Sequence, residues 1–307
     1  MSAAGLIAPT VFTRSRPATM ANLARNGAGV GGDRLLRWST AREGAWRLLD
    51  RHVPAGARVA VIGAGNGDDL PLTRLAARAS RLDLLDLDLA ALRRARRRCP
   101  AELRPRVRLD RCDVTAGAAD RITRAVRVGR PPHAGNVPGS PLGGGDYDVV
   151  IGDLFYSQLL YPALLDAGVS RAARRRVLEV GGPALTDAVV ARMHASAAPG
   201  ARVIHLHDIA GWWEGHPQPV SLAAILSQDD LEAASVLIAR CRQPLGVDPR
   251  QSAHRLGARV MDTALWEWPF AAGATYLVRA TVTDRPGRRR HTGELREVAQ
   301  PPGARRP

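Results

Sequence analysis

The chain has 307 residues and a formal net charge of +15, and 45% of its residues are hydrophobic, which allows a sizeable core and excludes a disordered chain. It contains no apolar run of about 18 residues, so we expect no membrane span. Three scattered cysteines, and the lack of a signal-like segment over residues 1–13, predict a cytoplasmic protein without disulfides.

The positive charge raises the question of nucleic acid, but all 44 basic residues are arginine and none is lysine. This bias is as typical of a GC-rich genome as of selection for phosphate binding. The arginines cluster at 93–98 and 171–176, on expected helices, and at 285–306, and we interpret them as solvated surface. Nucleic acid is therefore not the expected partner, although an RNA-directed enzyme remains an alternative.

The chain is expected to form one domain over residues 41–284. A partly irregular extension (1–40) precedes it and wraps the domain or covers a site, and a disordered Arg/Pro-rich tail (285–307) follows. Thr40 and Glu43 match a capping box that would begin the first helix, and Pro183 suits the first turn of a later one. Hydrophobic periodicity predicts helices at 40–53, 69–79, 90–98, 183–196 and 230–242, and strands at 58–62, 82–87, 106–111, 147–151, 202–207, 259–268 and 275–283.

Strands and helices alternate along most of this domain, which is typical of crossover units. We therefore predict an α/β fold, with a doubly wound, mostly parallel seven-stranded sheet and helices on both faces. The last two strands are close enough in sequence to pair as a terminal antiparallel hairpin. Residues 129–146, rich in Pro and Gly, are expected to form a long loop.

The strand at 58–62 runs into glycines at alternate positions, Gly63, Gly65 and Gly67. Glycine is required where the chain turns sharply and its backbone must approach a ligand closely. On its own the pattern also fits an ordinary strand-to-helix turn. It predicts a ligand site only together with polar groups at neighbouring strand ends.

Acidic residues follow the next two predicted strands. Asp86 closes the second strand, where a carboxylate can accept hydrogen bonds from both hydroxyl groups of a ribose, and Asp88 is the competing candidate. Asp113 follows the third strand and could accept a hydrogen bond from an exocyclic adenine amine. A helix cap or a turn residue is an equally good interpretation of Asp113 alone.

Together these residues resemble the class I, Rossmann-like methyltransferases, over about residues 57–283. The fourth-strand segment 147–154 and the closing pair 266–270 and 275–278 belong to the same resemblance. It implies S-adenosyl-L-methionine as the cofactor, with its methionine moiety beside the glycine turn and its amine near Asp153. The implied cofactor-binding residues are Gly63, Ala64, Gly65, Asn66, Gly67, Asp86, Leu87, Asp113, Val114 and Asp153.

Other enzymes and binding proteins share this type of sheet. A nicotinamide-dependent oxidoreductase would need a glycine at position 68, where Asp68 would instead repel a pyrophosphate. A polyamine-synthase-like aminopropyl transferase stays open because of the segment 153–156. A non-catalytic nucleoside-binding protein is disfavoured by the intact glycine turn and Asp86.

The expected reaction is methyl transfer to a small-molecule acceptor in metabolism, and the sequence does not identify that acceptor. Tyr156 and His207 follow the fourth and fifth strands, at the edge where ligands bind, and are predicted as catalytic, substrate-side residues. No metal site is expected, because the spacing of His205, His207 and His216 matches no metal motif. Trp212 and Trp213 are predicted either to wall the acceptor site or to anchor the segment 211–257.

Overall fold

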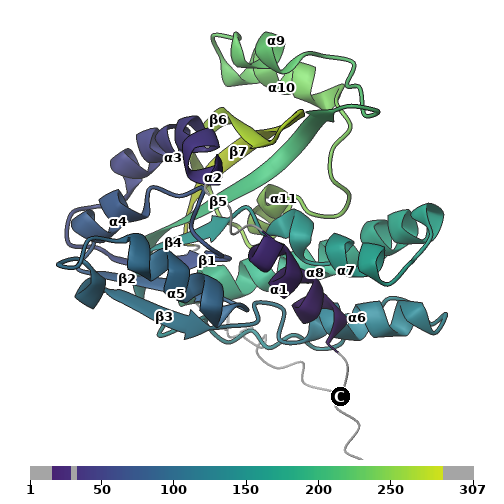
Figure 1. Ribbon diagram of the computed structural model, residues 1–307, viewed down its shortest axis with the longest axis horizontal. Helices are drawn as coiled ribbons and strands as arrows, with labels where there is room; N and C mark the ends of the chain where they lie inside the picture. The colour runs from purple at the N-terminus through teal and green to yellow at the C-terminus, as the bar shows by residue number, and fades with distance from the viewer. Residues whose placement is uncertain (1–15, 29–32, 286–307) are drawn as a thin grey trace, which may run out of the picture.

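A computed structural model describes residues 16–28 and 33–285, and a seven-stranded sheet runs through its centre (Figure 1). The strand order is β3-β2-β1-β4-β5-β7-β6, with β1 to β5 parallel and β7 antiparallel to both of its neighbours. The strands are β1 (Arg58–Ile62), β2 (Arg81–Asp86), β3 (Val107–Arg111), β4 (Tyr147–Asp153), β5 (Ala197–Trp213), β6 (Val260–Ala271) and β7 (Ala274–Asp284). The predicted doubly wound, mostly parallel sheet with a terminal antiparallel hairpin is confirmed.

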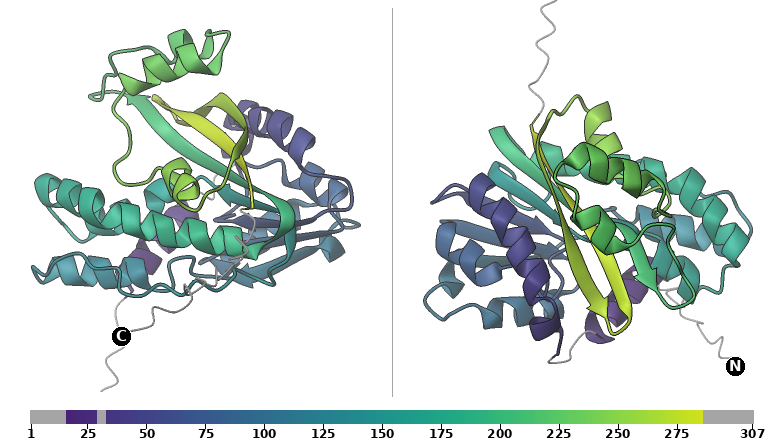
Figure 2. Two further views of the ribbon diagram at one scale, coloured as in Figure 1. Left: turned by 180° about the vertical axis from the view of Figure 1, so that it is seen from behind. Right: turned by 90° about the horizontal axis from the view of Figure 1, so that it is seen from above.

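Helices cover both faces of the sheet, as predicted (Figures 1 and 2). The α-helices are α1 (Pro17–Ala28), α2 (Asp33–Arg37), α3 (Ser39–His52), α4 (Leu72–Arg78), α5 (Leu89–Arg98), α6 (Ala118–Arg127), α7 (Tyr161–Asp166), α8 (Arg171–Ser196), α9 (Leu222–Leu226), α10 (Leu231–Ala239) and α11 (Pro249–Arg255), and the 3-10 turns are η1 (Arg104–Arg106) and η2 (Tyr156–Gln158). None of the helices in the described part of the chain is long and apolar enough to cross a membrane.

The core has two layers because successive side chains of a strand point to opposite faces. In β1, Val59 and Val61 pack with α3, α4 and α5, whereas Ala60 and Ile62 pack with α6 and α8. All four side chains are fully buried, which explains why a continuous apolar run rather than an alternating one marks this strand in the sequence.

Two predicted helix starts are wrong. Ser39 begins α3, and the Thr40 side chain makes no capping hydrogen bond, because α2 leads almost directly into α3 and Glu43 pairs instead with Arg74 of α4. Pro183 lies inside α8 rather than in a first turn, because the helix begins at Arg171 with Ser170 as its N-cap.

Most of the remaining boundaries agree with the predictions within a few residues. The strand β1 coincides with the predicted span, and α10 begins after an Asp230 cap as expected. The loop 129–146 contains neither helix nor strand. The predicted disordered tail lies almost wholly outside the described residues, and the domain boundaries stay a prediction.

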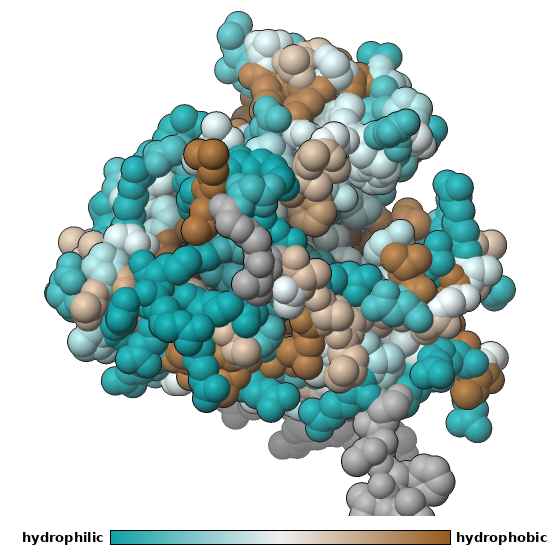
Figure 3. All heavy atoms as spheres, in the orientation of Figure 1, coloured by the Kyte–Doolittle hydropathy of each residue, from teal (hydrophilic) through white to brown (hydrophobic). Residues whose placement is uncertain are grey.

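The segment between β5 and α11 projects from one end of the sheet and carries α9 and α10 (Figures 1 and 2). It packs on the sheet through Ile225 and Ile238, which meet Leu277 of β7. Apolar side chains gather on its outer surface, whereas hydrophilic side chains cover the region of α5 (Figure 3). The arginines of α5 lie on that hydrophilic surface, as predicted for the cluster at 93–98.

The helix α1 precedes the predicted domain but is joined to it by a buried carboxylate. Asp120 of α6 accepts hydrogen bonds from the backbone N–H of Ala18 at 2.6 Å and from the Thr19 hydroxyl at 3.0 Å. The first N–H groups of a helix have no partner within the helix, so this carboxylate acts as a cap supplied by another element. It fixes α1 against α6 and α7.

We expect Asp120→Ala to release α1 while leaving the sheet folded. The lost cap should cost about 1–2 kcal/mol locally, so backbone amides of residues 17–28 should exchange with deuterium faster, by about tenfold. Hydrogen exchange read by mass spectrometry measures this. Asp148→Ala, at the opposite edge of the sheet, serves as the control, and unchanged exchange in Asp120→Ala would show that α1 is held by other contacts.

Candidate functional site

A cleft of about 1210 Å³ lies at the carboxyl ends of β1, β2, β4 and β5. The order of strands changes direction between β1 and β4, and open α/β sheets bind their ligands beside such a point. The volume exceeds that of a typical single-ligand pocket, so it can hold two molecules. All ten residues predicted to bind the cofactor line this cleft: Gly63, Ala64, Gly65, Asn66, Gly67, Asp86, Leu87, Asp113, Val114 and Asp153.

Two positions of the glycine turn favour glycine for different reasons. A Cβ at Gly63 would lie 2.7 Å from the Phe155 ring, so no larger residue fits beneath that ring. Gly65 has a φ of +46°, and a Cβ added there would lie 3.4 Å from the side-chain oxygen of Asn26, which is ordinary contact. Its left-handed backbone, rather than a lack of space, therefore favours glycine at this position of the cleft.

Asp86 joins the glycine turn to the end of β2. Its carboxylate accepts hydrogen bonds from the N–H of Gly65 and from the N–H of Asp88, both at 2.9 Å. The side-chain amide of Asn26 donates a third, longer bond at 3.4 Å. A carboxylate offers about four acceptor positions, so about one remains for a donor in the cleft. Burial raises the pKa of Asp86. Asp88, the competing candidate, instead caps α5 through the N–H groups of Ala90 and Ala91 and is not among the residues that line the cleft.

Asp113 lies at the rim of the cleft and stabilises its own turn. One carboxylate oxygen accepts from the N–H and the hydroxyl of Thr115, at 2.8 and 2.7 Å, and the other accepts from the N–H of Gly117 at 2.7 Å. The alternative of a turn residue therefore describes its contacts, and about one acceptor position stays free. The proposed contact with adenine stays a prediction.

Asp153, at the end of β4, forms a carboxyl pair with Asp69, a residue that the sequence did not single out. Burial, together with the charge of Asp69, raises the pKa of Asp153 well above its ordinary value. Burial raises the pKa of Asp69 to about 6, and its hydrogen bond with Asp153 opposes this rise. Within the described residues Asp153 Oδ1 has no hydrogen-bond partner. Both shifts favour a proton shared by the pair, and the free oxygen of Asp153 can accept from a cation.

Asp68 does not face the cleft as an isolated charge. It forms an ion pair with Arg98 of α5, and the backbone carbonyl of Asp68 accepts a hydrogen bond from Arg42 at 2.6 Å. The repulsion of a pyrophosphate predicted from Asp68 alone is therefore weakened by Arg98. The carboxyl pair of Asp69 and Asp153 has no such counterion within bonding distance in the described chain, and it lines the same cleft.

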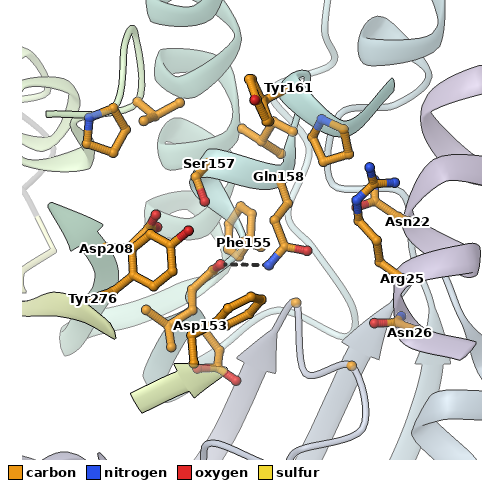
Figure 4. Close-up of a pocket in the computed structure, with 18 of the residues that line it drawn as sticks. Asn22, Arg25, Asn26, Asp153, Phe155, Ser157, Gln158, Tyr161, Asp208 and Tyr276 are labelled. Carbon is orange, nitrogen blue, oxygen red and sulfur yellow. Dashed lines mark hydrogen bonds between the residues drawn. The ribbon is translucent and has the colours of Figure 1, made fainter. Parts of the chain in front are cut away.

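The helix α1 forms one wall of the cleft. The sequence predicted only that the extension wraps the domain or covers a site, and it identified none of the residues involved. Figure 4 shows Asn22, Arg25 and Asn26 on one side and Asp208 and Tyr276 on the other. The backbone carbonyl of Asn26 accepts a hydrogen bond from Asn66 of the glycine turn at 3.1 Å, and its side chain lies 3.4 Å from Asp86. The extension thus contacts the turn and the acid together, as expected of a segment that covers a site.

Tyr156 and His207, predicted as substrate-side residues, are not among the residues that line the cleft, and that prediction is corrected. Tyr156 is fully buried beneath β4 and β5, where its hydroxyl lies 2.6 Å from Nδ1 of His205. His207 is also buried, 3.9 Å from Asp248. Their sequence neighbours Phe155, Ser157 and Asp208 do line the cleft.

Asp208 and Tyr276 close the far side of the cleft, next to η2 (Figure 4). Burial raises the pKa of Asp208 to about 6, against a hydrogen bond with Ser157 that lowers it. Its Oδ1 has no partner in the described structure. Each tryptophan has one of the two predicted positions. Trp212 donates to the Val220 carbonyl at 2.9 Å and anchors the α9–α10 segment, whereas Trp213 lines the cleft.

No family model and no curated protein matches the sequence. Solved structures with some likeness include three methyltransferases. A TehB-like SAM-dependent methyltransferase from Corynebacterium glutamicum is 14% identical over 88% of this chain and 98% of its own, with a TM-score of 0.37. A SAM-dependent methyltransferase from Aquifex aeolicus is 10% identical over 86% and 98%, with a TM-score of 0.40.

The third is a methyltransferase from Haloferax volcanii in complex with the Trm112 methyltransferase activator. It is 14% identical over 89% of this chain and 99% of its own, with a TM-score of 0.43. Likenesses as distant as these identify neither the reaction nor the acceptor. The site's chemistry has to be inferred from its own residues.

The histidines behind the cleft make stability depend on pH. Burial lowers the pKa of His194 from 6.5 to about 4 and also lowers the pKa values of His205 and His207. An unfolded chain takes up a proton near pH 6.5, whereas folded His194 does so only near pH 4. The unfolded state therefore binds more protons in this window, and the free energy of unfolding falls as the pH drops through it.

We expect His194→Leu to reduce the loss of stability between pH 6.5 and 4 by about 1.4 kcal/mol per pH unit. Urea unfolding at several pH values measures the slope. His254→Leu, which changes an exposed histidine of α11, should leave the slope as in the wild type. Equal slopes in wild type and His194→Leu would mean that His194 titrates normally in the folded protein.

Proposed function

We propose that the protein transfers a methyl group from S-adenosyl-L-methionine to a small-molecule acceptor. The observation that carries this proposal is the bond of the Asp86 carboxylate to the N–H of Gly65. This bond supports the proposal because it holds a carboxylate, which can accept from ribose hydroxyls, beside the glycine turn, and Asp69 and Asp153 line the same cleft. Carboxylates suit a ligand with an ammonium group and a sulfonium centre and no phosphate.

The residues present fit this cofactor. Gly63 to Gly67 would lie beside its methionine moiety, Asp86 would accept from its ribose hydroxyls, and Leu87, Asp113 and Val114 would surround its adenine. The free oxygen of buried Asp153 would accept from the ammonium group. When bound, the cofactor supplies a methyl group already activated by its positive sulfur. The protein then has to bind, orient the acceptor and exclude water.

A nicotinamide dinucleotide fits the same residues poorly. Its pyrophosphate would meet Asp69 and Asp153 at the glycine turn, where a dinucleotide fold offers uncharged backbone N–H groups. An aminopropyl transferase has lost its specific support, since Tyr156 of the segment 153–156 is buried against His205. Methyl transfer is therefore the function that the site favours.

Asp208 is the residue best placed to take a proton from an acceptor. A base is needed only if the accepting atom carries a proton at the working pH. Asp208 lines the cleft with an unbonded oxygen, and its raised pKa of about 6 suits proton transfer near neutrality. It takes the place that the sequence assigned to His207, one residue earlier in β5.

We expect the wild-type protein to bind S-adenosylhomocysteine in a calorimeter and not to bind NADH. Asp86→Asn should weaken the binding by about 100-fold, because the negative charge is lost and one acceptor oxygen becomes an NH2 donor that cannot accept from a hydroxyl group. Asp148→Asn is the matched control, since Asp148 is exposed at the opposite edge of the sheet in a pair with Arg58. Thermal unfolding of each variant checks that it is folded.

The absence of heat with S-adenosylhomocysteine in the wild type, or preferential binding of NADH, would contradict the proposed function. Equal weakening by Asp148→Asn would mean that the loss of binding reports general damage rather than a lost contact.

We also expect binding of S-adenosylhomocysteine to release about one proton near pH 7. An ammonium group beside Asp153 would lower the pKa of the carboxyl pair, so the shared proton would leave. The observed binding enthalpy should then change with the ionisation enthalpy of the buffer. Asp153→Asn should bind more weakly and without this dependence, and a wild-type enthalpy that is the same in all buffers would place the ammonium group elsewhere.

A further inference from the structure

Charge is divided across the cleft. The acids Asp69, Asp86, Asp153 and Asp208 lie along the sheet edge, whereas the arginines come from the surrounding helices and from the segment after α10. The lining arginines are Arg25, Arg34, Arg171, Arg174, Arg175 and Arg242. A cationic cofactor at the sheet edge leaves the arginine side to the second molecule that the cleft can hold.

Four of these arginines already have a partner. Arg25 forms two hydrogen bonds with Asp166, at 2.9 and 3.1 Å, and Arg175 bonds Glu179 at 2.8 Å. Arg34 lies over the Trp38 ring, and Arg174 lies over the Tyr161 ring at 5.9 Å. These contacts fix the walls of the cleft, and the carboxylates of Asp166 and Glu179 offset the charges of Arg25 and Arg175.

Arg171 and Arg242 differ from the others. They come from the start of α8 and from the segment after α10, and both line the cleft. No hydrogen bond or ion pair joins either guanidinium group to another described residue. Both also approach His216, whose pKa they lower after the larger effect of burial. Two positive charges that line one cleft without a counterion favour the binding of an anion there.

Flat aromatic surfaces flank this pair. Trp213 and His216 stack with ring centroids 4.0 Å apart and planes 6° apart, and the Trp213 side chain is 40% exposed. Tyr161, beneath Arg174, is 45% exposed and also lines the cleft. Exposed aromatic rings in a cleft offer surfaces on which a planar ligand can stack.

We propose that the methyl acceptor is a small planar molecule that carries an anionic group, a carboxylate or a phosphate, held by Arg171 and Arg242 at the mouth of the cleft. This inference rests on the proposed methyl transfer and names the class of its acceptor. The anion would lie on the arginine side, and the ring would stack on Trp213 or Tyr161. The accepting atom would then point toward the acidic edge.

Both guanidinium groups are exposed at the mouth of the cleft, whereas Asp69, Asp86, Asp153 and Asp208 line its interior. A small molecule is favoured over RNA because it can keep its one anionic group at the mouth while the accepting atom reaches past these acids. A polyanion would bring further negative charges against them.

The test measures binding of 4-hydroxycinnamate, of phenyl phosphate and of the neutral amide of 4-hydroxycinnamate, by ligand-observed NMR and calorimetry, with and without saturating S-adenosylhomocysteine. We expect at least one anion to bind about tenfold more tightly than the amide. The double variant Arg171→Gln/Arg242→Gln should lose this preference and keep the affinity for S-adenosylhomocysteine. Arg176→Gln, on the same helix but outside the cleft lining, is the matched control.

Equal binding of anion and amide, or binding of neither anion, would overturn the proposal, as would an equal effect of Arg176→Gln. Arginine-dependent binding of a short single-stranded RNA, without binding of the small anions, would assign the pair to nucleic acid and also overturn it. Failure of the proposed methyl transfer looks different: S-adenosylhomocysteine would not bind, while the preference for an anion would persist in its absence.

Discussion

The hydrogen bond between the N–H of Gly65 and the carboxylate of Asp86 is the contact on which the floor of the cleft depends. The same carboxylate accepts from the N–H of Asp88, and Asp88 in turn caps α5. One side chain therefore joins the turn after β1, the end of β2 and the start of the next helix. Burial of this carboxylate raises its pKa, so the arrangement costs free energy that new donors in the cleft would offset.

The fold could be predicted because its strands are buried on both faces and end in recognisable residues. Val59 to Ile62 form an uninterrupted apolar run, and the glycines after it mark where the strand stops. Parallel strands bring their carboxyl ends to one edge, so acids that follow separate strands had to meet there. This rule needs no knowledge of helix positions, and Asp86 and Asp153 do line the same cleft.

The direction of a side chain beyond a strand end could not be predicted in this way. Leu154 follows β4 with a φ of +49°, and this left-handed residue turns Phe155 onto Gly63 and buries Tyr156. In β5 the alternation of side chains exposes Asp208 to the cleft and buries His207. An error of one residue therefore exchanges a cleft residue for a core residue. The position of α1 beside the cleft could not be predicted either, because its attachment depends on Asp120, about 100 residues away in the chain.

The excursion that carries α9 and α10 leaves the sheet after Trp213 and returns before α11. Its two stems supply Trp213, His216 and Arg242 to the cleft, whereas the glycine turn and its acids belong to the opposite half of the sheet. A change in the length or sequence of this excursion would therefore alter the side of the cleft that it lines and leave the side of the glycine turn intact. Such a division lets selection diversify the partner molecule of a reaction while the chemistry of the donor is inherited unchanged.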